Sequence, residues 1–148
     1  MTDKGMWEIW EYSWGDFYRK FKNEPEKAQE YSFEFGKKMG KALMAKLDLK
    51  GNDLDTLAKV VNAFMEECKT EVTAKVEGDK VIYRNRSFCL MMVSAKSFNI
   101  PWLWIDENCS WPTLGGLASV VNPNIKHKVT FARARGDPLC EHTFEIIK

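Results

Sequence analysis

The spacing of apolar residues first changes near residue 70, and that change constrains the fold more than any other feature. Before it, apolar side chains recur every three or four residues, as on one face of an α-helix. After it, short segments alternate apolar and polar side chains, as half-buried β-strands do. The sequence therefore predicts a single α+β domain of 148 residues, with a helical region at 1–69 and a ββααββ region at 70–148.

The helical region is expected to contain three amphipathic helices. The apolar stripe of the first helix consists of Met6, Trp7, Trp10, Tyr12, Trp14, Phe17, Tyr18 and Phe21. The second begins at Pro25, because proline is tolerated in a first helical turn, and it ends near Leu47. The third follows an N-cap at Asn52 or Asp53, and its stripe ends at Cys68, which we assign to packing. The three helices should pack on an antiparallel sheet formed by the second region.

The second region is expected to form two hairpins with two short helices between them. The expected strands are 72–76, 81–88, 125–134 and 139–147, with turns at 77–80 and 135–138. The expected helices are 89–98 and 110–121, separated by an aromatic loop or short strand at 102–105. Gly115 and Gly116 each weaken a helix by about 1 kcal/mol, and close approach of another backbone or of a ligand would explain their presence.

In the last strand, Cys140 and His142 share a face with Phe144 and Ile146. Because this apolar face must point inward, the thiol and the imidazole should also point inward, with their Cα atoms roughly 6.5 Å apart. A histidine in this setting is more often a satisfied core residue than a catalyst. His127 lies in a Lys-His-Lys run and is expected to be a solvated strand residue.

Charge and motif content exclude several classes of function. The 22 Lys and Arg residues balance 21 Asp and Glu residues, which argues against nucleic acid as the main partner. No apolar run reaches the ~18 residues of a membrane span, and no signal peptide is evident. We therefore expect a cytoplasmic protein with reduced thiols and no membrane partner. Nucleotide-binding, metalloprotease and α/β-hydrolase motifs do not occur, and no cofactor is expected.

Cys109 is the first candidate for chemistry, because it precedes the helix start expected at Ser110. The positive end of a helix dipole favours the thiolate, which is the nucleophilic form of cysteine. Asp106 could then act as an acid or base, and Cys140 with His142 could transfer or orient protons. The alternative is a cysteine packed beneath the aromatic loop. Thiols and imidazole can also bind zinc, but none of these residues form a tight pair in the sequence, so no metal site is expected.

Aromatic residues flank this cysteine and favour a pocket for a small, partly apolar ligand. The residues expected to bind such a ligand are Cys89, Trp102, Trp104, Trp111 and Arg133. Two alternatives remain for the tryptophans. They could form a hydrophobic lid over the core, or an exposed patch through which two copies of the chain form a homodimer.

The cysteines also carry a family resemblance. Cys89 opens an apolar helix, Cys109 precedes a second helix, and Cys140 lies in the segment Arg-Gly-Asp-Pro-Leu-Cys-Glu-His-Thr-Phe. With this pattern, residues 81–147 resemble the L-2-amino-thiazoline-4-carboxylic acid hydrolase-like family and, more distantly, the 4-vinyl reductase ligand-binding domain. The resemblance implies a small-molecule hydrolase that opens a cyclic C–N or C–S substrate with the help of a cysteine. The alternative is a ligand-binding or sensor domain without turnover.

The chain departs from both families at specific positions. In the hydrolase-like pattern an aspartate follows the middle cysteine by three positions, and Pro112 stands there in this chain. In the 4-vinyl reductase type, a glutamate and a cysteine on the strand that leads into the final hairpin often bind zinc, and here Val129 and Ala132 occupy those positions. The resemblance therefore implies roles for the three cysteines and brings no zinc site with it.

Overall fold

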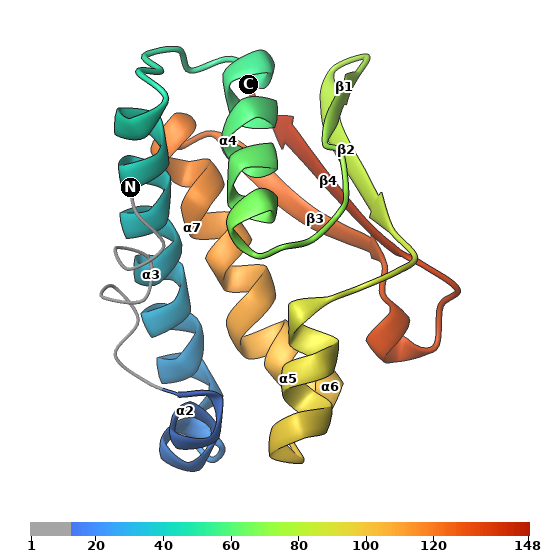
Figure 1. Cartoon of the computed structure of the whole chain (residues 1–148). Coiled ribbons are helices and arrows are strands. Elements are labelled where there is room, and N and C mark those ends of the chain that lie inside the picture. The colour runs from blue at the N-terminus through green and yellow to red at the C-terminus, as the bar shows by residue number, and fades with distance from the viewer. Residues whose placement is uncertain (1–12) are drawn as a thin grey trace.

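A helical layer covers a four-stranded sheet in the computed structural model of the protein, which describes residues 13–148. The strands are β1 (Lys75–Glu77), β2 (Lys80–Asn85), β3 (Ile125–Phe131) and β4 (Cys140–Ile146). They pair antiparallel in the order β1-β2-β4-β3. The helices pack on one face of the sheet and extend beyond its end (Figure 1). The predicted α+β class, with helices between two hairpins, is confirmed.

The N-terminal helices are α2 (Trp14–Phe21), α3 (Pro25–Lys46) and α4 (Leu54–Glu67). Pro25 occupies the first turn of α3, as predicted. Asp53 caps α4, because its carboxylate accepts a hydrogen bond of 2.9 Å from the backbone N–H of Thr56. The predicted stripe residues Met6, Trp7, Trp10 and Tyr12 lie outside the described residues. None of the helices in the described part of the chain is both long and apolar enough to cross a membrane.

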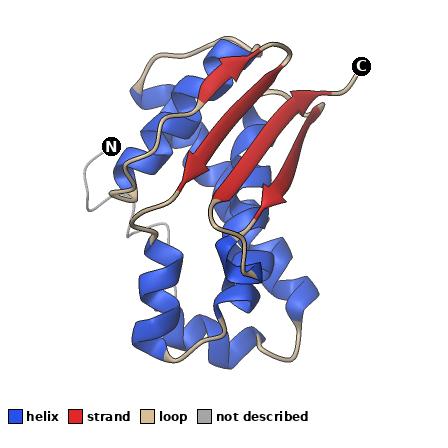
Figure 2. Cartoon of the chain, turned by 90° about the vertical axis from the view of Figure 1, so that its right-hand side faces the viewer, coloured by secondary structure: helices blue, strands red, loops and turns tan. Residues whose placement is uncertain are grey.

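The two faces of the sheet differ in polarity. Tyr83, His142 and Phe144 are buried on the face that meets the helices. The opposite face carries charged pairs, such as Arg84 and Glu141, whose Nε and Oε2 atoms lie 2.7 Å apart. Figure 2 shows this charged face toward the viewer, with the helices behind it. The alternation confirms that the apolar residues of the last strand point inward.

Helices α3 and α7 (Trp111–Val121) approach each other backbone to backbone. A Cβ atom added at Gly36 would lie 2.0 Å from the carbonyl oxygen of Thr113. One added at Gly116 would lie 2.0 Å from the carbonyl oxygen of Phe33. Only glycine permits this contact. The predicted close approach is confirmed for Gly116, whereas a Cβ at Gly115 would meet only the Phe33 ring, at 3.7 Å.

One long helix replaces the predicted loop and helix start. α6 (Trp102–Ile105), a π turn η1 (Asp106–Ser110) and α7 follow one another without a break. The predictions of a loop or strand at 102–105 and of a helix start at Ser110 are therefore wrong. The preceding helix, α5 (Leu90–Phe98), ends at Asn99 in the left-handed conformation.

All four strands are shorter than predicted, and at β1 and β3 the reason is that side chains bind the adjoining backbone. Asn62 Oδ1 accepts a hydrogen bond of 2.7 Å from Ala74 N, and Asn62 Nδ2 donates to Ala74 O at 3.0 Å. A strand partner cannot use those groups, and β1 begins only at Lys75. In the last hairpin, Ala132 N donates to Asp137 Oδ2 at 2.8 Å. The chain then forms a 3₁₀ turn, η2 (Arg133–Arg135), instead of continuing β3.

Candidate ligand-binding cavity

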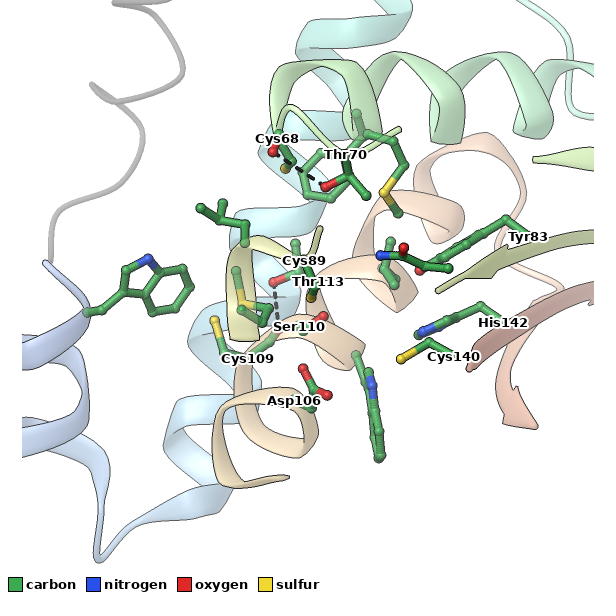
Figure 3. Close-up of a pocket in the computed structure, with 18 residues that line it drawn as sticks. Cys68, Thr70, Tyr83, Cys89, Asp106, Cys109, Ser110, Thr113, Cys140 and His142 are labelled. Carbon is green, nitrogen blue, oxygen red and sulfur yellow. Dashed lines mark hydrogen bonds between the residues drawn. The ribbon is translucent and has the colours of Figure 1, made fainter. Parts of the chain in front are cut away.

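A cavity lies between two apolar clusters of the core, at the end of the sheet where β2 ends and β4 begins. Its water-accessible volume is about 80 Å³. One water needs about 10–15 Å³ on this measure, so the cavity can hold several waters or a small molecule. Figure 3 shows Tyr83, Cys140 and His142 on the sheet side of the cavity. Asp106 and Cys109 lie on the helix side.

Most of the remaining wall is apolar. It includes Phe64, Met65, Leu90, Met91, Trp111 and Leu114. Cys89, Cys109 and Cys140 lie far apart in the sequence, and the fold brings them to this one cavity together with His142, which is two residues from Cys140. Apolar walls with a few polar groups are typical of cavities that bind small molecules.

The π turn explains how the long helix passes through Pro112. Proline has no backbone N–H to donate to the carbonyl of Asn108 four residues earlier. Ser32 Oγ of α3 donates to that carbonyl instead, at 3.1 Å. The N–H of Trp111 bonds to the carbonyl of Asp106, five residues back, which widens the helix by one residue. Such widened turns are frequent at functional sites, and this one carries Asp106 and Cys109.

Cys109 differs from the prediction in its surroundings. It lies inside a continuous helix, so its thiol does not face the positive end of a helix dipole. The side chain is 1% exposed, and burial raises the pKa of the Cys109 thiol to about 12. The hydroxyls of Ser32 and Thr113 lower that pKa, but burial dominates. At neutral pH Cys109 is a neutral thiol rather than a nucleophilic thiolate.

Cys89 has the position at a helix start that the sequence suggested for Cys109. It is the N-cap residue of α5, and the backbone N–H groups of Met92 and Met91 lower the pKa of its thiol. Burial outweighs these two amides, so the pKa of Cys89 is still raised. The pKa of Cys140 is also raised by burial, although its sulfur accepts a hydrogen bond of 3.4 Å from Arg133 N.

Asp106 is buried at 4% exposure and lines the cavity. Its carboxyl group has no hydrogen bond or ion pair within residues 13–148. Burial and, to a smaller extent, the negative charge of the neighbouring Glu107 together raise the pKa of Asp106 from 3.8 to about 7. Asp106 can therefore gain or lose a proton near neutral pH.

His142 belongs to a stack of rings across the sheet. His127 Nε2 and His142 Nδ1 lie 2.9 Å apart, and the two ring planes differ by 8°. Tyr83 stacks on His142 with ring centroids 4.6 Å apart. Burial lowers the pKa of His127 to about 4 and the pKa of His142 well below its ordinary value, so both imidazoles are neutral at pH 7. The prediction of a solvated His127 is wrong, because its ring lies half-buried on the inner face.

Two polar atoms on the sheet side face the cavity without a protein partner. The hydroxyl of Tyr83 makes no hydrogen bond to another described residue, and neither does Nε2 of His142. Both side chains are 5% exposed. Together with the Asp106 carboxyl, they give the apolar cavity three buried groups that are free to bind a ligand.

The predicted ligand-binding residues divide into two groups. Cys89 and Trp111 line the cavity, whereas Trp102, Trp104 and Arg133 do not. Trp104 packs edge-on against Tyr18, with ring centroids 4.9 Å apart, and so belongs to the core beside α2. Arg133 lies over the Trp102 ring, 5.7 Å from its centroid. The four tryptophans of the described chain are all half-buried, and none forms an exposed patch.

Sequence reasoning missed several residues of the site, among them Tyr83 and Ser110 in the cavity wall and His127, which contacts His142. Tyr83 and His127 both lie at inward positions of alternating strands, and this period-two pattern could have identified them. Ser110 lines the cavity because the π turn rotates it there, and the sequence offers no comparable signal.

In residues 13–148 no group of three or more His, Cys, Asp or Glu side chains is arranged to hold a metal ion. Comparisons with protein-family models, curated proteins and solved structures find no match to this chain.

Proposed function

We propose that the protein binds a small, largely apolar molecule in this cavity and does not convert it chemically. The observation that carries the proposal is the combination of an apolar wall with three unpaired polar groups, on Tyr83, Asp106 and His142. These three groups border the cavity and are accessible to a ligand, whereas the one fully buried side-chain polar atom without a partner among residues 13–148 is Nε1 of Trp102. A ligand with one or two polar atoms on an apolar body would satisfy both parts of the cavity.

The state of the thiols supports binding over catalysis. Burial raises the pKa of Cys89, Cys109 and Cys140, so each is protonated near pH 7. No cysteine of the described chain forms a hydrogen bond to an imidazole that could remove its proton. Nucleophilic cysteines normally have a lowered pKa and a neighbouring base.

Thermal unfolding with a panel of small molecules tests this proposal. p-Cresol, benzyl alcohol and cyclohexanol each combine a single ring with one polar group, as the size and lining of the cavity require. A ligand at a hundredfold excess over its Kd stabilises a protein by about 2.7 kcal/mol, which corresponds to a rise in Tm of about 8 °C for a chain of this size. Mass spectrometry should recover the bound molecule unchanged.

A matched pair of variants locates the binding. Ser110→Leu places an apolar side chain in the cavity and should abolish the rise in Tm. Ser97→Leu makes the same change at an exposed position of α5 and should leave the rise unchanged. The proposal is wrong if no member of the panel raises Tm, or if Ser110→Leu responds like the parent protein.

A second candidate function is the hydrolase activity that the family resemblance implies. It is favoured by Asp106, because a carboxyl group with a pKa of about 7 can act as a general acid or base. It is weakened by the absence of any Lys or Arg among the described residues of the wall, which leaves a substrate carboxylate without a partner. Incubation with L-2-amino-thiazoline-4-carboxylic acid, followed by mass spectrometry of the products, separates the two candidates. Ring opening that is lost in Asp106→Asn would favour the hydrolase.

A further inference from the structure

Among residues 13–148, no side chain provides a counter-charge for the Asp106 carboxyl group. No lysine or arginine among residues 13–148 lines the cavity. The guanidinium of Arg133 donates to the Ser87 carbonyl at 2.6 Å, and that of Arg135 lies over the Trp111 ring at 5.1 Å. A buried carboxylate is strongly disfavoured unless a cation or several hydrogen bonds accompany it.

The groups that face Asp106 are neutral or carry the same sign of charge. Burial raises the pKa of the surrounding thiols and of the nearby phenol, so all of them are uncharged at neutral pH. They are Cys89 of α5, Cys109 of the same π turn, and Tyr83 and Cys140 of the sheet. Glu107, the next residue, is exposed and adds negative charge. When Asp106 is ionised, the cavity is therefore negative, and no described side chain offsets it.

The aromatic rings of the cavity wall would favour a positively charged ligand. The Trp111 and Tyr83 rings both line the cavity. The face of an aromatic ring attracts cations, and the attraction is stronger away from water. The neutral imidazole of His142 can accept or donate a hydrogen bond through Nε2, depending on its tautomer. An ammonium group has three donors and could bind the carboxylate while it meets a ring face or an acceptor.

We infer that the ligand of this cavity is a small organic cation, an ammonium group on a compact apolar or aromatic body, with the ammonium paired to Asp106. The inference rests on the proposed function and narrows it to one class of ligand. The cavity volume of about 80 Å³ limits the body to a few carbon atoms or a single ring. The ligand completes an ion pair for which the protein supplies only the acidic half.

Calorimetric titration of matched amines and alcohols tests this inference. Butylamine, cyclohexylamine and benzylamine are compared with butanol, cyclohexanol and benzyl alcohol, which have similar shapes and no charge. At pH 8 the best amine should bind at least about 30-fold more tightly than its alcohol, as expected when a buried charge gains its partner. At pH 5.5 the amine should bind about 30-fold more weakly than at pH 8, because Asp106 must first lose a proton. The alcohol should not weaken in this way.

Two variants complete the test. Asp106→Asn should abolish the preference for amines while the alcohols still bind. Glu107→Gln removes the neighbouring exposed carboxylate and should keep the preference within about twofold. If Asp106→Asn does not fold, the pH dependence of the parent protein decides the matter, together with release of a proton on amine binding at pH 6.

The outcomes separate this inference from the proposed function. Alcohols that bind at pH 8 as tightly as their amines would overturn the inference and leave binding in the cavity standing. A preference for amines that survives in Asp106→Asn, or that does not change between pH 8 and pH 5.5, would also overturn it. If neither amines nor alcohols bind, both the inference and the proposed function are wrong.

Discussion

Asp106→Asn should stabilise the empty protein above neutral pH. In the folded protein the pKa of Asp106 is raised to about 7, whereas in the unfolded chain it returns to about 3.8. Between these values the folded state holds a proton that the unfolded state has lost. Folding stability therefore falls as pH rises from about 4 to 7 and stays low above 7. Asparagine has nearly the same shape and never becomes charged, so it removes this loss.

The magnitude follows from the two pKa values. Each pKa unit is worth about 1.4 kcal/mol, and the step from 3.8 to about 7 therefore corresponds to about 4 kcal/mol at pH 8. Solvent that entered the cavity would screen part of the charge, so we expect a gain of about 2–4 kcal/mol in the free energy of unfolding. For a chain of this length the gain corresponds to a rise in Tm of about 6–12 °C.

Urea unfolding at pH 4, 6 and 8 measures the effect. The variant and the parent protein should have the same midpoint at pH 4, and the gap should open as pH rises. Asp55→Asn serves as the control, because Asp55 is an exposed carboxylate in the first turn of α4. This control should lose a few tenths of a kcal/mol at pH 8 through the helix dipole. An Asp106→Asn protein that is no more stable than the parent at pH 8 would refute the account of a buried, unpaired carboxylate.

Further predictions concern the helix contact, the thiols and the histidine pair. Gly116→Ala should lower the free energy of unfolding in urea by about 3 kcal/mol or more, because its Cβ would strike a backbone carbonyl. Gly115→Ala should leave that free energy unchanged or raise it by up to about 1 kcal/mol, and equal effects of the two variants would contradict the contact. In the native protein at pH 8, iodoacetamide should modify Cys89 about tenfold or more faster than Cys109, because Cys109 is fully buried and its pKa is about 12. Peptide mass spectrometry measures the two rates, and the reverse order would show that Cys109 is accessible. Burial lowers the pKa of His127 to about 4, so on acidification the unfolded chain binds a proton at this imidazole before the folded protein does, and stability falls. His127→Phe should therefore lose less stability than the parent protein between pH 6.5 and 4. An equal loss for the two proteins in urea unfolding would contradict this explanation.

Local signals predicted the helices and turns well. Of the two predicted N-cap residues, Asn52 and Asp53, the second caps the helix, and the predicted hairpin turn at 77–80 is present, with Gly78 at a φ of 64°. Both features depend on a few neighbouring residues, and a sequence displays such features directly. The inward direction of Cys140 and His142 followed from strand alternation, which is also local.

The errors arose where distant residues determine the backbone. Pro112 normally marks the start of a helix, and the prediction followed that rule. Here the helix continues through Pro112 because Ser32, from a different helix, binds the carbonyl that proline leaves free. A contact over 76 residues cannot be read from local spacing. The same error led to the expected thiolate at Cys109, whereas the cysteine at an actual helix start is Cys89.

The π turn also bears on how this protein can change over evolutionary time. It contains one residue more than a regular helix would use over the same rise, so loss of a single codon within Asp106–Ser110 would restore an ordinary helix. Each residue turns a helix by about 100°, and such a deletion would rotate the segment before it by that angle relative to α7. The glycine contact with α3 lies after the turn and would keep its phase. A one-residue deletion would therefore alter the turn that carries Asp106 and Cys109, while the glycine contact further along the helix would keep its place.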